Sequence, residues 1–347
     1  MTGDQHVAIG NIEIGRGLPI AVQTMYDSAI PHAMDALDAL LRRIGKLNAM
    51  GCDIIRFSYP SADDHEAFSY LCKKSPIPVV ADIHFDYKLA LDALSCGAHK
   101  IRINPGNIGA KWKVEEVVRS AKDHESAIRI GLTSGSLPRG NDPLDQLMSN
   151  TALEYLSWFE QWGFHNSVVS LKASDVNLTM QANRLFASQS SYPLHLGVTE
   201  AGSVISAVTR STWALGQLLS EGIGNTLRIS ITGEIEHEVQ AGVELLRTLG
   251  LRRKGIRIVS CPRCGRHSFD SQGFLASVES ELLSIDKDLT VAIMGCQVNG
   301  PGEAKAADLA ITGLGNSIFL YEKGKLVKKV TQQEAKAALL EAIEHAE

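Results

Sequence analysis

Short apolar runs alternate with helical patterns at a nearly constant interval through the first two thirds of the chain. Eight runs are predicted to be strands: residues 20–22, 54–57, 78–80, 100–103, 128–131, 167–171, 194–197 and 227–229. Their mean spacing is roughly 30 residues, the length of one strand with its crossover helix. Between them, apolar residues recur with helical periodicity, as at Leu37, Leu40, Leu41, Ile44 and Leu47. Continuously apolar strands separated by amphipathic helices indicate a parallel sheet covered on both faces.

Eight units of this size predict an α/β fold, an N-terminal TIM (β/α)8 barrel, with a doubly wound open sheet as the alternative. A hairpin is expected before the first unit, at residues 7–14 around Gly10-Asn11. A change of composition at Arg252-Arg253-Lys254-Gly255 predicts two domains, residues 1–253 and 254–347.

The second domain is expected to be a smaller α/β unit. Strands are predicted at residues 256–260, 291–294, 309–312, 318–321 and 326–330, with a helix around 274–285. The segment Thr331-Gln-Gln-Glu334 has the form of a capping box, which predicts that a last helix opens there. Ala335, Leu339 and Ile343 would share one face of that helix.

The overall charge and hydropathy exclude several classes of protein. The chain is 44% hydrophobic and carries a formal net charge of −5, which argues against disorder and against a nucleic-acid-binding protein. No apolar run approaches the roughly 18–20 residues that span a bilayer, and the N-terminus is neither a signal nor a transit peptide. A cytoplasmic location is therefore expected, where thiols stay reduced.

The six cysteines divide into two groups. Cys52, Cys72 and Cys96 are isolated in or beside apolar helical stretches and are predicted to be buried core residues. The others, Cys261, Cys264 and Cys296, have the spacing C-x2-C-x31-C. Cys261-Pro-Arg-Cys264 directly follows one predicted strand, and Cys296 follows another by way of Gly295. Two strands joined by a helix run parallel, so these three thiols are expected at one edge of the sheet. Such a set selects zinc or an iron–sulfur cluster.

The fourth ligand is open from the spacing alone. A structural zinc site commonly uses two close pairs of N or S ligands, but the second half here has one cysteine. The next residue of ligand type is Glu303, after the loop Asn299-Gly-Pro-Gly302, whose glycines permit close approach of the backbone. His267 is the alternative fourth ligand. The spacing favours an iron–sulfur centre over zinc, and a carboxylate ligand could exchange with a substrate oxygen more readily than a thiolate.

Cationic residues recur at the predicted strand ends, which form the active face of a barrel. They are Arg56, Arg102, Arg129, Lys172 and Arg228. Burying five like charges near one axis requires anions, and the guanidinium fork suits phosphate oxygens. We therefore predict a polyanion site, with the loop at residues 104–109 as a further source of N–H donors. The alternative is that some of these side chains face solvent or pair with local carboxylates.

Longer motifs carry a resemblance to a known family. They are Pro19-Ile-Ala-Val-Gln-Thr-Met25, Ala81-Asp-Ile-His-Phe-Asp86, Arg102-Ile-Asn-Pro-Gly-Asn-Ile-Gly109, Lys172-Ala-Ser-Asp175, His195-Leu-Gly-Val-Thr-Glu-Ala-Gly202, Ser220-Glu-Gly-Ile-Gly224, Cys261-Pro-Arg-Cys264 and Gly295-Cys-Gln-Val-Asn-Gly-Pro-Gly-Glu303. Together they resemble the family of 4-hydroxy-3-methylbut-2-enyl diphosphate synthases, of the methylerythritol phosphate route to isoprenoids.

The resemblance implies reductive ring opening of 2-C-methyl-D-erythritol 2,4-cyclodiphosphate. Two electrons would come from ferredoxin or flavodoxin through a [4Fe–4S] cluster in the C-terminal domain. It also implies a homodimer in which one subunit's cluster domain caps the other subunit's barrel. The alternative function is a barrel lyase or isomerase that acts on a phosphorylated substrate and has a structural zinc domain.

The resemblance also assigns roles to single residues. It implies that Arg56, Arg102, Arg129, Lys172, Arg228 and Ser230 bind the diphosphate, with Asn299 as a further substrate-binding residue. His195 and Asp82 are implied as catalytic pocket residues. Glu303 is implied as both fourth iron ligand and catalytic residue. Thr133 stands where the family has asparagine, so it keeps a hydroxyl at that contact but not an amide.

Overall fold

The computed structural model describes residues 5–137, 142–253, 255–262, 264–265, 267–296, 305–314 and 317–346. The chain forms two compact units, Met1–Arg252 and Arg253–Glu347, and the boundary expected from composition lay one residue later. Among the described residues, no helix combines the length and apolar character that crossing a membrane requires.

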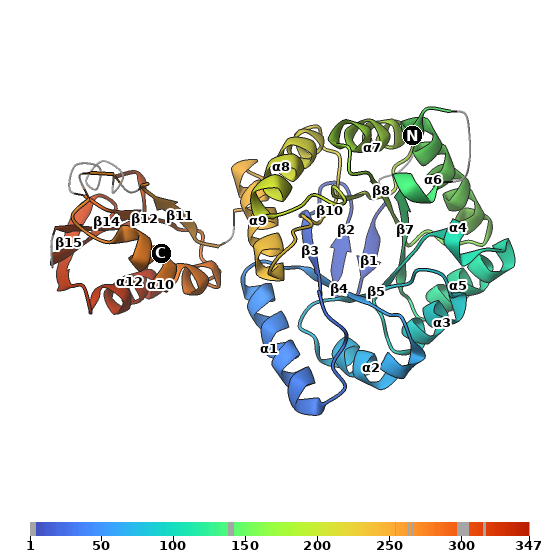
Figure 1. Cartoon of the computed structure of the whole chain (residues 1–347), viewed down its shortest axis with the longest axis horizontal. Helices are drawn as coiled ribbons and strands as arrows, with labels where there is room; N and C mark the ends of the chain where they lie inside the picture. Colours follow the sequence, from blue (N-terminus) through green and yellow to red (C-terminus); the bar gives the residue numbers. More distant parts are fainter. Residues whose placement is uncertain are drawn as a thin grey trace. The chain divides into compact units, whose positions relative to one another are not determined.

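Eight parallel strands make the first unit a TIM barrel (Figure 1). They are β3 (Ala21–Met25), β4 (Ile54–Ser58), β5 (Val79–Asp82), β6 (Lys100–Ile103), β7 (Ala127–Thr133), β8 (Ser167–Lys172), β9 (His195–Leu196) and β10 (Thr226–Leu227). The strand order is β8-β7-β6-β5-β4-β3-β10-β9, and a parallel bridge between Val169 and Leu194 joins the two ends. The predicted barrel is therefore confirmed, and the open sheet was the wrong alternative.

Helices surround these strands (Figure 1). They are α1 (Met34–Ala49), α2 (His65–Lys74), α3 (Tyr87–Ser95), α4 (Pro105–Ile108), α5 (Lys111–Asp123), α6 (Leu144–Gln161), α7 (Val176–Gln189), α8 (Val204–Ser220) and α9 (Ile235–Thr248), with short 3-10 turns η1 (Ala62–Asp64) and η2 (Ser134–Ser136). In α1, Leu37, Leu40, Ile44 and Leu47 are buried, as their periodicity predicted.

An apolar plug closes the amino-terminal end of the barrel. The hairpin of β1 (Val7–Ile9) and β2 (Ile12–Ile14) packs Val7, Ile9 and Ile14 against the first inward residues of the strands, Ala21, Ile54, Val80, Ala127 and Val168. The Asn166 side chain holds the hairpin in place, since it bonds both the N–H and the carbonyl of Ala8, at 3.0 and 3.1 Å. The lower half of the barrel interior is therefore dry, and polar groups lie above it.

The second unit has one mixed sheet, in the order β11-β12-β13-β14-β15. Its strands are β11 (Arg257–Ser260), β12 (Thr290–Met294), β13 (Leu309–Leu314), β14 (Ser317–Glu322) and β15 (Lys325–Thr331), and its helices include α10 (Ser271–Leu283) and α12 (Ala335–His345). The first three strands are parallel, and β14 and β15 are antiparallel to their neighbours. The predicted smaller α/β domain is confirmed.

The predicted capping box is only half formed. Glu334 accepts hydrogen bonds from the N–H and hydroxyl of Thr331, at 2.9 and 2.8 Å. Thr331, however, is the last residue of β15, so its hydroxyl donates to Glu334 instead of capping an N–H of α12. The predicted face is nevertheless correct, since Ala335, Leu339 and Ile343 are buried.

The plug gives a stability prediction. Ile9→Ala should lower the free energy of unfolding of the barrel by about 2–5 kcal/mol, because the fully buried side chain leaves a cavity. All four tryptophans lie in the barrel, so urea unfolding followed by tryptophan fluorescence reports this unit. Glu13→Ala, on the exposed face of the same hairpin, should change it by less than about 1 kcal/mol. Equal losses in both variants would contradict the plug.

Candidate functional site

Strand alternation directs a layer of cations into the upper barrel. On β6, Lys100 and Arg102 point inward, while Ile101 and Ile103, which alternate with them, pack in the core under the helices. Register then places neighbouring charges side by side, since Asp82 of β5 lies beside Arg102, which lies beside Arg129 of β7. The cations predicted from strand ends therefore do converge.

Asp82 is the anionic centre of this layer. Its buried carboxylate lies 3.4 Å from Arg56, 3.4 Å from Arg102 and 3.6 Å from His84. Burial opposes ionisation, but Arg56, Arg102, Arg129 and His84 outweigh it and hold the pKa of Asp82 below its usual value. Burial also lowers the pKa of Arg56, to about 10, so that arginine stays charged at neutral pH. Asp82 therefore remains a carboxylate.

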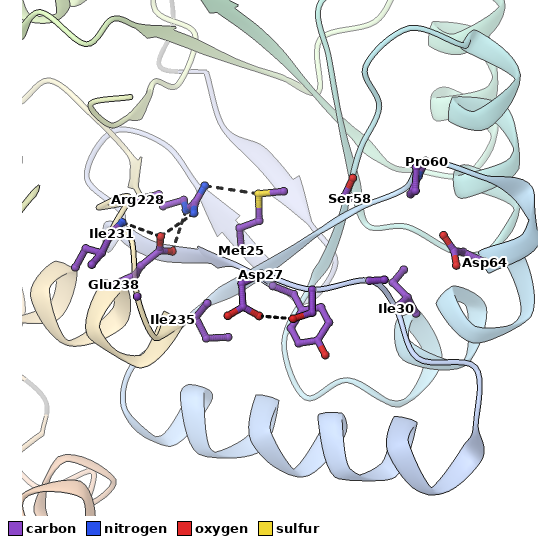
Figure 2. A pocket seen from close by; sticks show the side chains of 14 residues that line it. Met25, Asp27, Ile30, Ser58, Pro60, Asp64, Arg228, Ile231, Ile235 and Glu238 are labelled. Carbon is purple, nitrogen blue, oxygen red and sulfur yellow. Dashed lines mark hydrogen bonds and ion pairs between the residues drawn. The ribbon is translucent and has the colours of Figure 1, made fainter. Parts of the chain in front are cut away.

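A second carboxylate, from a helix, holds the last cation. Glu238 of α9 accepts from Arg228 at 2.7 and 2.9 Å, from the Thr24 hydroxyl at 2.7 Å and from the Ile231 N–H at 3.1 Å. Figure 2 shows the Arg228–Glu238 pair, with the Met25 sulfur beside the same guanidinium. This carboxylate is only 2% exposed, so the pair is fixed in one orientation.

Deeper cations lack comparable partners. Arg129 is 2% exposed, and its Nε and Nη1 have no hydrogen-bond partner in the described structure. Lys100 reaches only Gln23, at 3.4 Å. Burial, reinforced by neighbouring arginines, lowers the pKa values of Arg129, Lys100 and Lys172 well below their usual ranges. Gly131 and Gly197 make room for this layer, because a Cβ at either would collide with Arg102 or Lys172.

Two predicted positions differ from the structure. Arg129 was expected at a strand end, but β7 runs on to Thr133, so Arg129 is its third residue and lies below the rim. His195 is the second residue of the predicted strand 194–197, but in the structure it is the first residue of β9 and is fully buried. Its Nδ1 lies 2.6 Å from the Thr226 hydroxyl and its Nε2 has no partner. Burial, with Lys172 and Arg129 nearby, lowers the pKa of His195 well below 6.5, so the ring is neutral.

A pocket of about 410 Å³ opens beside this layer (Figure 2). Its lining comes from the segments after β3, β4 and β10 and from α9: Met25, Tyr26, Asp27, Ser28, Ala29, Ile30, Ser58, Pro60, Asp64, Arg228, Ile231, Gly233, Ile235 and Glu238. It therefore lies at the carboxyl ends of the strands, where TIM barrels bind substrates.

The remaining predicted contacts lie at the rim. Thr133 ends β7 beside Lys172, and its hydroxyl and N–H both bond Ser136, at 3.1 Å each. Asn104 also reaches Ser136, at 2.9 Å. Ser230 is half-buried two residues after Arg228. Their roles in substrate binding stay predictions.

Sequence reasoning missed three residues of this layer. Lys100 has a sequence signal, because it is two residues before Arg102 on the same strand and so faces the same side. Gln23 on β3 follows the same alternation with Met25. Glu238 has no such signal, since it comes from the helix after β10 and reaches the barrel only through tertiary packing.

The cysteines of the second unit gather at one sheet edge. Strands β11 and β12 are parallel neighbours, so Cys261 and the Gly295-Cys296 pair follow at the same end. The Gly295 N–H donates to the Cys261 sulfur at 3.1 Å. Cys264 is exposed, and no disulfide joins any of the six cysteines. The predicted residues Asn299 and Glu303 lie outside the described residues.

The donor set of this edge, three thiols, fits a soft metal centre. One tetrahedral zinc holds its sulfur ligands about 3.8 Å apart, given zinc–sulfur bonds of about 2.3 Å. In the described chain the sulfurs of Cys261, Cys264 and Cys296 do not all lie within 4.8 Å of one another. His267, the alternative ligand, directs its Nδ1 to the Cys264 carbonyl, 2.8 Å away.

A barrel with convergent cations at its mouth, joined to a unit with three thiols at a strand edge, defines a two-part TIM-barrel enzyme. Residues 4–243 match the GcpE TIM-barrel domain and residues 257–345 match the GcpE protein C-terminal domain. The chain belongs to the GcpE family.

Relatives share this organisation over almost their whole length. A protein from Geobacter sulfurreducens is 44% identical over 345 residues, covering 98% of this chain and 97% of its own. One from Thermodesulfovibrio yellowstonii is 42% identical over 344 residues, with the same coverage. Both are named 4-hydroxy-3-methylbut-2-en-1-yl diphosphate synthase (flavodoxin). The family resemblance of the sequence motifs is therefore confirmed.

Solved structures confirm the barrel fold. Dihydropteroate synthase from Yersinia pestis superposes with a TM-score of 0.51 at 12% identity, covering 71% of this chain and 97% of its own. The Xanthomonas albilineans dihydropteroate synthase with 4-aminobenzoic acid gives a TM-score of 0.52 at 14% identity, with the same coverage. At such low identity the likeness concerns the fold alone.

The depressed pKa of Asp82 predicts a pH-dependent stability. Its folded pKa lies below the usual 3.8, so its contribution is complete above about pH 4 and is lost as the pH falls through the folded value. Asp82→Asn should therefore destabilise the barrel by about 3–5 kcal/mol at pH 7, because it leaves the arginines without their carboxylate. Urea unfolding should show this difference shrinking below pH 4.

Asp123→Asn is the matched control, because Asp123 is exposed at the end of α5. It should change the free energy of unfolding by less than about 0.5 kcal/mol at every pH. A loss in Asp82→Asn that is the same at pH 3 and pH 7 would contradict the assigned ionisation.

Proposed function

We propose that this enzyme converts 2-C-methyl-D-erythritol 2,4-cyclodiphosphate to 4-hydroxy-3-methylbut-2-enyl diphosphate by reductive dehydration and ring opening. The observation that carries this proposal is the convergence of cations in the upper barrel, beside the pocket, without enough carboxylates to pair them. Two buried carboxylates, Asp82 and Glu238, pair with Arg56, Arg102 and Arg228. Among the described residues, no ion pair joins the other three cations, Arg129, Lys100 and Lys172, to a carboxylate. The product in this proposal is taken from the name that the relatives carry.

The anionic substrate would supply the negative charge that the buried cations of the barrel lack. Leaving a buried charged donor without a partner costs more than about 1–3 kcal/mol. Diphosphate oxygens placed against the Arg129 guanidinium and the Lys172 ammonium would remove that cost and raise both depressed pKa values. Phosphate fits better than a single carboxylate because the cations come from several strands at two depths.

Asp82 and His195 then have separate roles. Asp82 is held as a carboxylate between Arg56 and Arg102, so it orients these two guanidinium groups toward the substrate. His195 is neutral, and its Nδ1 is engaged with Thr226. Its orphan Nε2 is therefore the atom that exchanges a hydrogen bond, or a proton, with a substrate oxygen. These assignments give each catalytic candidate a stated atom.

The second unit would supply the electrons. Cys261, Cys264 and Cys296, with Glu303 as fourth ligand, would hold a [4Fe–4S] cluster. Such a cluster transfers one electron at a time, so two transfers are needed for each turnover. The donor would be flavodoxin, which the names of the relatives include, or ferredoxin.

The active site would need both units together, and we propose a homodimer in which the cysteine edge of one subunit meets the barrel mouth of the other. Cations and thiols lie in different compact units, so neither unit holds the complete chemistry. Closed twofold pairing would give two equivalent sites in each dimer.

The function is tested by turnover of the cluster-reconstituted protein. Under anaerobic conditions, with reduced flavodoxin, the wild type should convert the cyclic diphosphate to the allylic diphosphate, measured by phosphorus NMR. Cys264→Ser should lose iron and turnover, because oxygen is a poor ligand for soft iron. Cys52→Ser, in the barrel core, is the control and should keep its iron. A colourless protein with stoichiometric zinc and no turnover would favour the lyase or isomerase alternative.

If each active site is shared between two subunits, a barrel variant and a cysteine variant should restore each other's activity in a mixed dimer. Arg102→Ala should weaken substrate binding by about 1.5–3 kcal/mol, since it removes a charged hydrogen bond. Co-refolding that variant with Cys264→Ser should give heterodimers that each contain one intact site. Because half of random dimers are mixed, activity should reach about a quarter of wild type if barrel and cluster come from different subunits. The assay uses a substrate concentration well below the KM of Arg102→Ala. If each site lies within one chain, the mixture then gains no activity over the two variants measured separately.

A further inference from the structure

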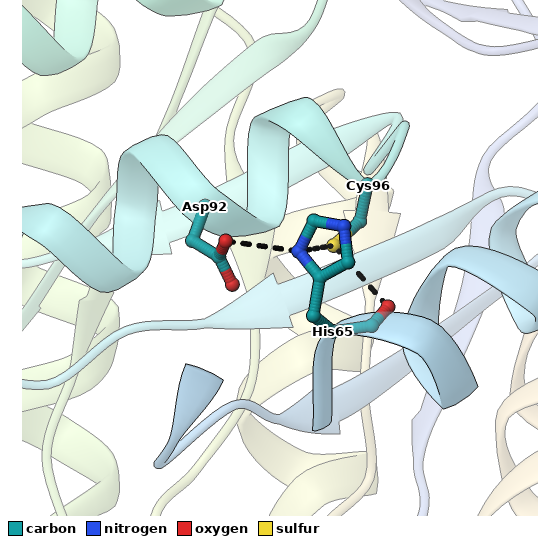
Figure 3. Close-up of side chains that lie close together, drawn as sticks. All are labelled: His65, Asp92 and Cys96. Atoms are coloured by element: carbon teal, nitrogen blue, oxygen red, sulfur yellow. Dashed lines mark hydrogen bonds and ion pairs between the residues drawn. The ribbon is translucent and has the colours of Figure 1, made fainter. Parts of the chain in front are cut away.

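A cluster of metal-binding side chains lies outside the proposed active site, where α2 packs against α3. It consists of His65, Asp92 and Cys96, whose donor atoms all lie within 4.8 Å of one another. Figure 3 shows the three side chains converging from the two helices. None of them lines the pocket at the barrel mouth. Sequence analysis predicted Cys96 to be a buried core residue, which it is, but did not connect it with the other two.

Helix geometry brings the three together. Asp92 and Cys96 are four residues apart at the end of α3, so both project from the same side of that helix. His65 is the first residue of α2 and meets them from the neighbouring helix. Its Nδ1 lies 2.9 Å from the Asp92 carboxylate and 3.3 Å from the Cys96 sulfur.

Two contacts meet on one nitrogen, Nδ1 of His65, and the Cys96 thiol also has the His65 carbonyl as an acceptor, 3.5 Å away. Nδ1 carries at most one proton, so it cannot donate fully to both the carboxylate and the sulfur. Three donor atoms around one point are the arrangement of a metal site. Tetrahedral zinc would place them about 3.3–3.6 Å apart, given bonds of about 2.0–2.3 Å, so small outward shifts of the side chains would admit the ion.

Surrounding residues provide the support that such a site requires. The Tyr59 hydroxyl donates to Asp92 and lies 3.8 Å from the Cys96 sulfur. An outer partner of this kind orients a ligand carboxylate. Cys96 is 1% exposed, whereas the His65 side chain is 45% exposed, so the site is buried on its sulfur side and open on its histidine side. A water molecule could complete the coordination there.

We propose that His65, Asp92 and Cys96 bind a divalent zinc-type cation that ties α2 to α3. Mixed nitrogen, oxygen and sulfur donors select zinc and its cobalt substitute over magnesium or calcium. The ion would stabilise the outer layer of the barrel and would not enter the reaction. This proposal does not depend on the proposed function.

Binding must displace protons. The Cys96 thiol loses its proton to solvent, and the histidine proton moves to Nε2, which leaves Nδ1 free to coordinate. The apparent affinity should therefore rise about tenfold for each pH unit between pH 6 and pH 8.

The test uses the full-length chain with Cys261→Ser, Cys264→Ser and Cys296→Ser together, so that the thiols of the second unit cannot bind the added metal. Titration with cobalt should produce one equivalent of a thiolate-to-cobalt charge-transfer band and tetrahedral d–d bands, which zinc then abolishes. Zinc should also raise the melting temperature of this protein, because the ion binds only the folded state.

Substitutions in that background decide the assignment. His65→Ala, on the exposed side, and Cys96→Ala should each weaken binding by more than about 100-fold, and Tyr59→Phe by about tenfold. Cys72→Ala is the matched control, because Cys72 is a buried cysteine of α2 outside the cluster, and it should bind as its parent does. Absence of the charge-transfer band, or its persistence in His65→Ala and Cys96→Ala, would overturn the proposal.

Discussion

The buried charge of the upper barrel is the constraint on which the rest of this structure depends. Cations from β4, β6, β7, β8 and the end of β10 share one small volume, and Asp82 and Glu238 are the buried carboxylates that partner them. Like charges at such depth repel strongly and are poorly hydrated, so the layer needs a rigid frame and a further anion. The closed barrel supplies the frame, and a diphosphate substrate would supply the anion. The affinity and the specificity of the barrel for its substrate would thus both come from the excess of buried cations over buried carboxylates.

Apolar packing in the lower barrel offsets the repulsion between the buried cations above it. Five inward-facing residues at the amino-terminal ends of the strands, Ala21, Ile54, Val80, Ala127 and Val168, are apolar and pack under the β1–β2 hairpin. The apolar floor fixes the strands, so the cations cannot spread apart to relieve their repulsion. Glycines at 131 and 197 leave space for long side chains above the floor. Stability is therefore concentrated at one end of the barrel and chemistry at the other, as in other TIM barrels.

The two compact units divide the chemistry between them. Among the residues that the structure describes, the barrel offers buried cations and a pocket, whereas the second unit offers three cysteines after parallel strands and no comparable group of buried cations. The outer-layer cluster of His65, Asp92 and Cys96 shows that metal-type donors also occur where they would serve structure. Position in the fold, rather than residue type, separates the two kinds of site.

The sequence by itself determined the order of strands and helices, the division into two domains and most of the converging cations, because these follow from local periodicity and from residues counted along single strands. It also determined the cysteine edge, since C-x2-C after one strand and a cysteine after the next meet wherever those strands are parallel. Tertiary structure alone decided the depth of Arg129, the burial of His195 and the arrival of Glu238 from α9. It also decided the meeting of His65 with Asp92 and Cys96. These features depend on how far a strand extends and on which helix packs beside which, and both are set by packing over the whole barrel rather than by any local pattern.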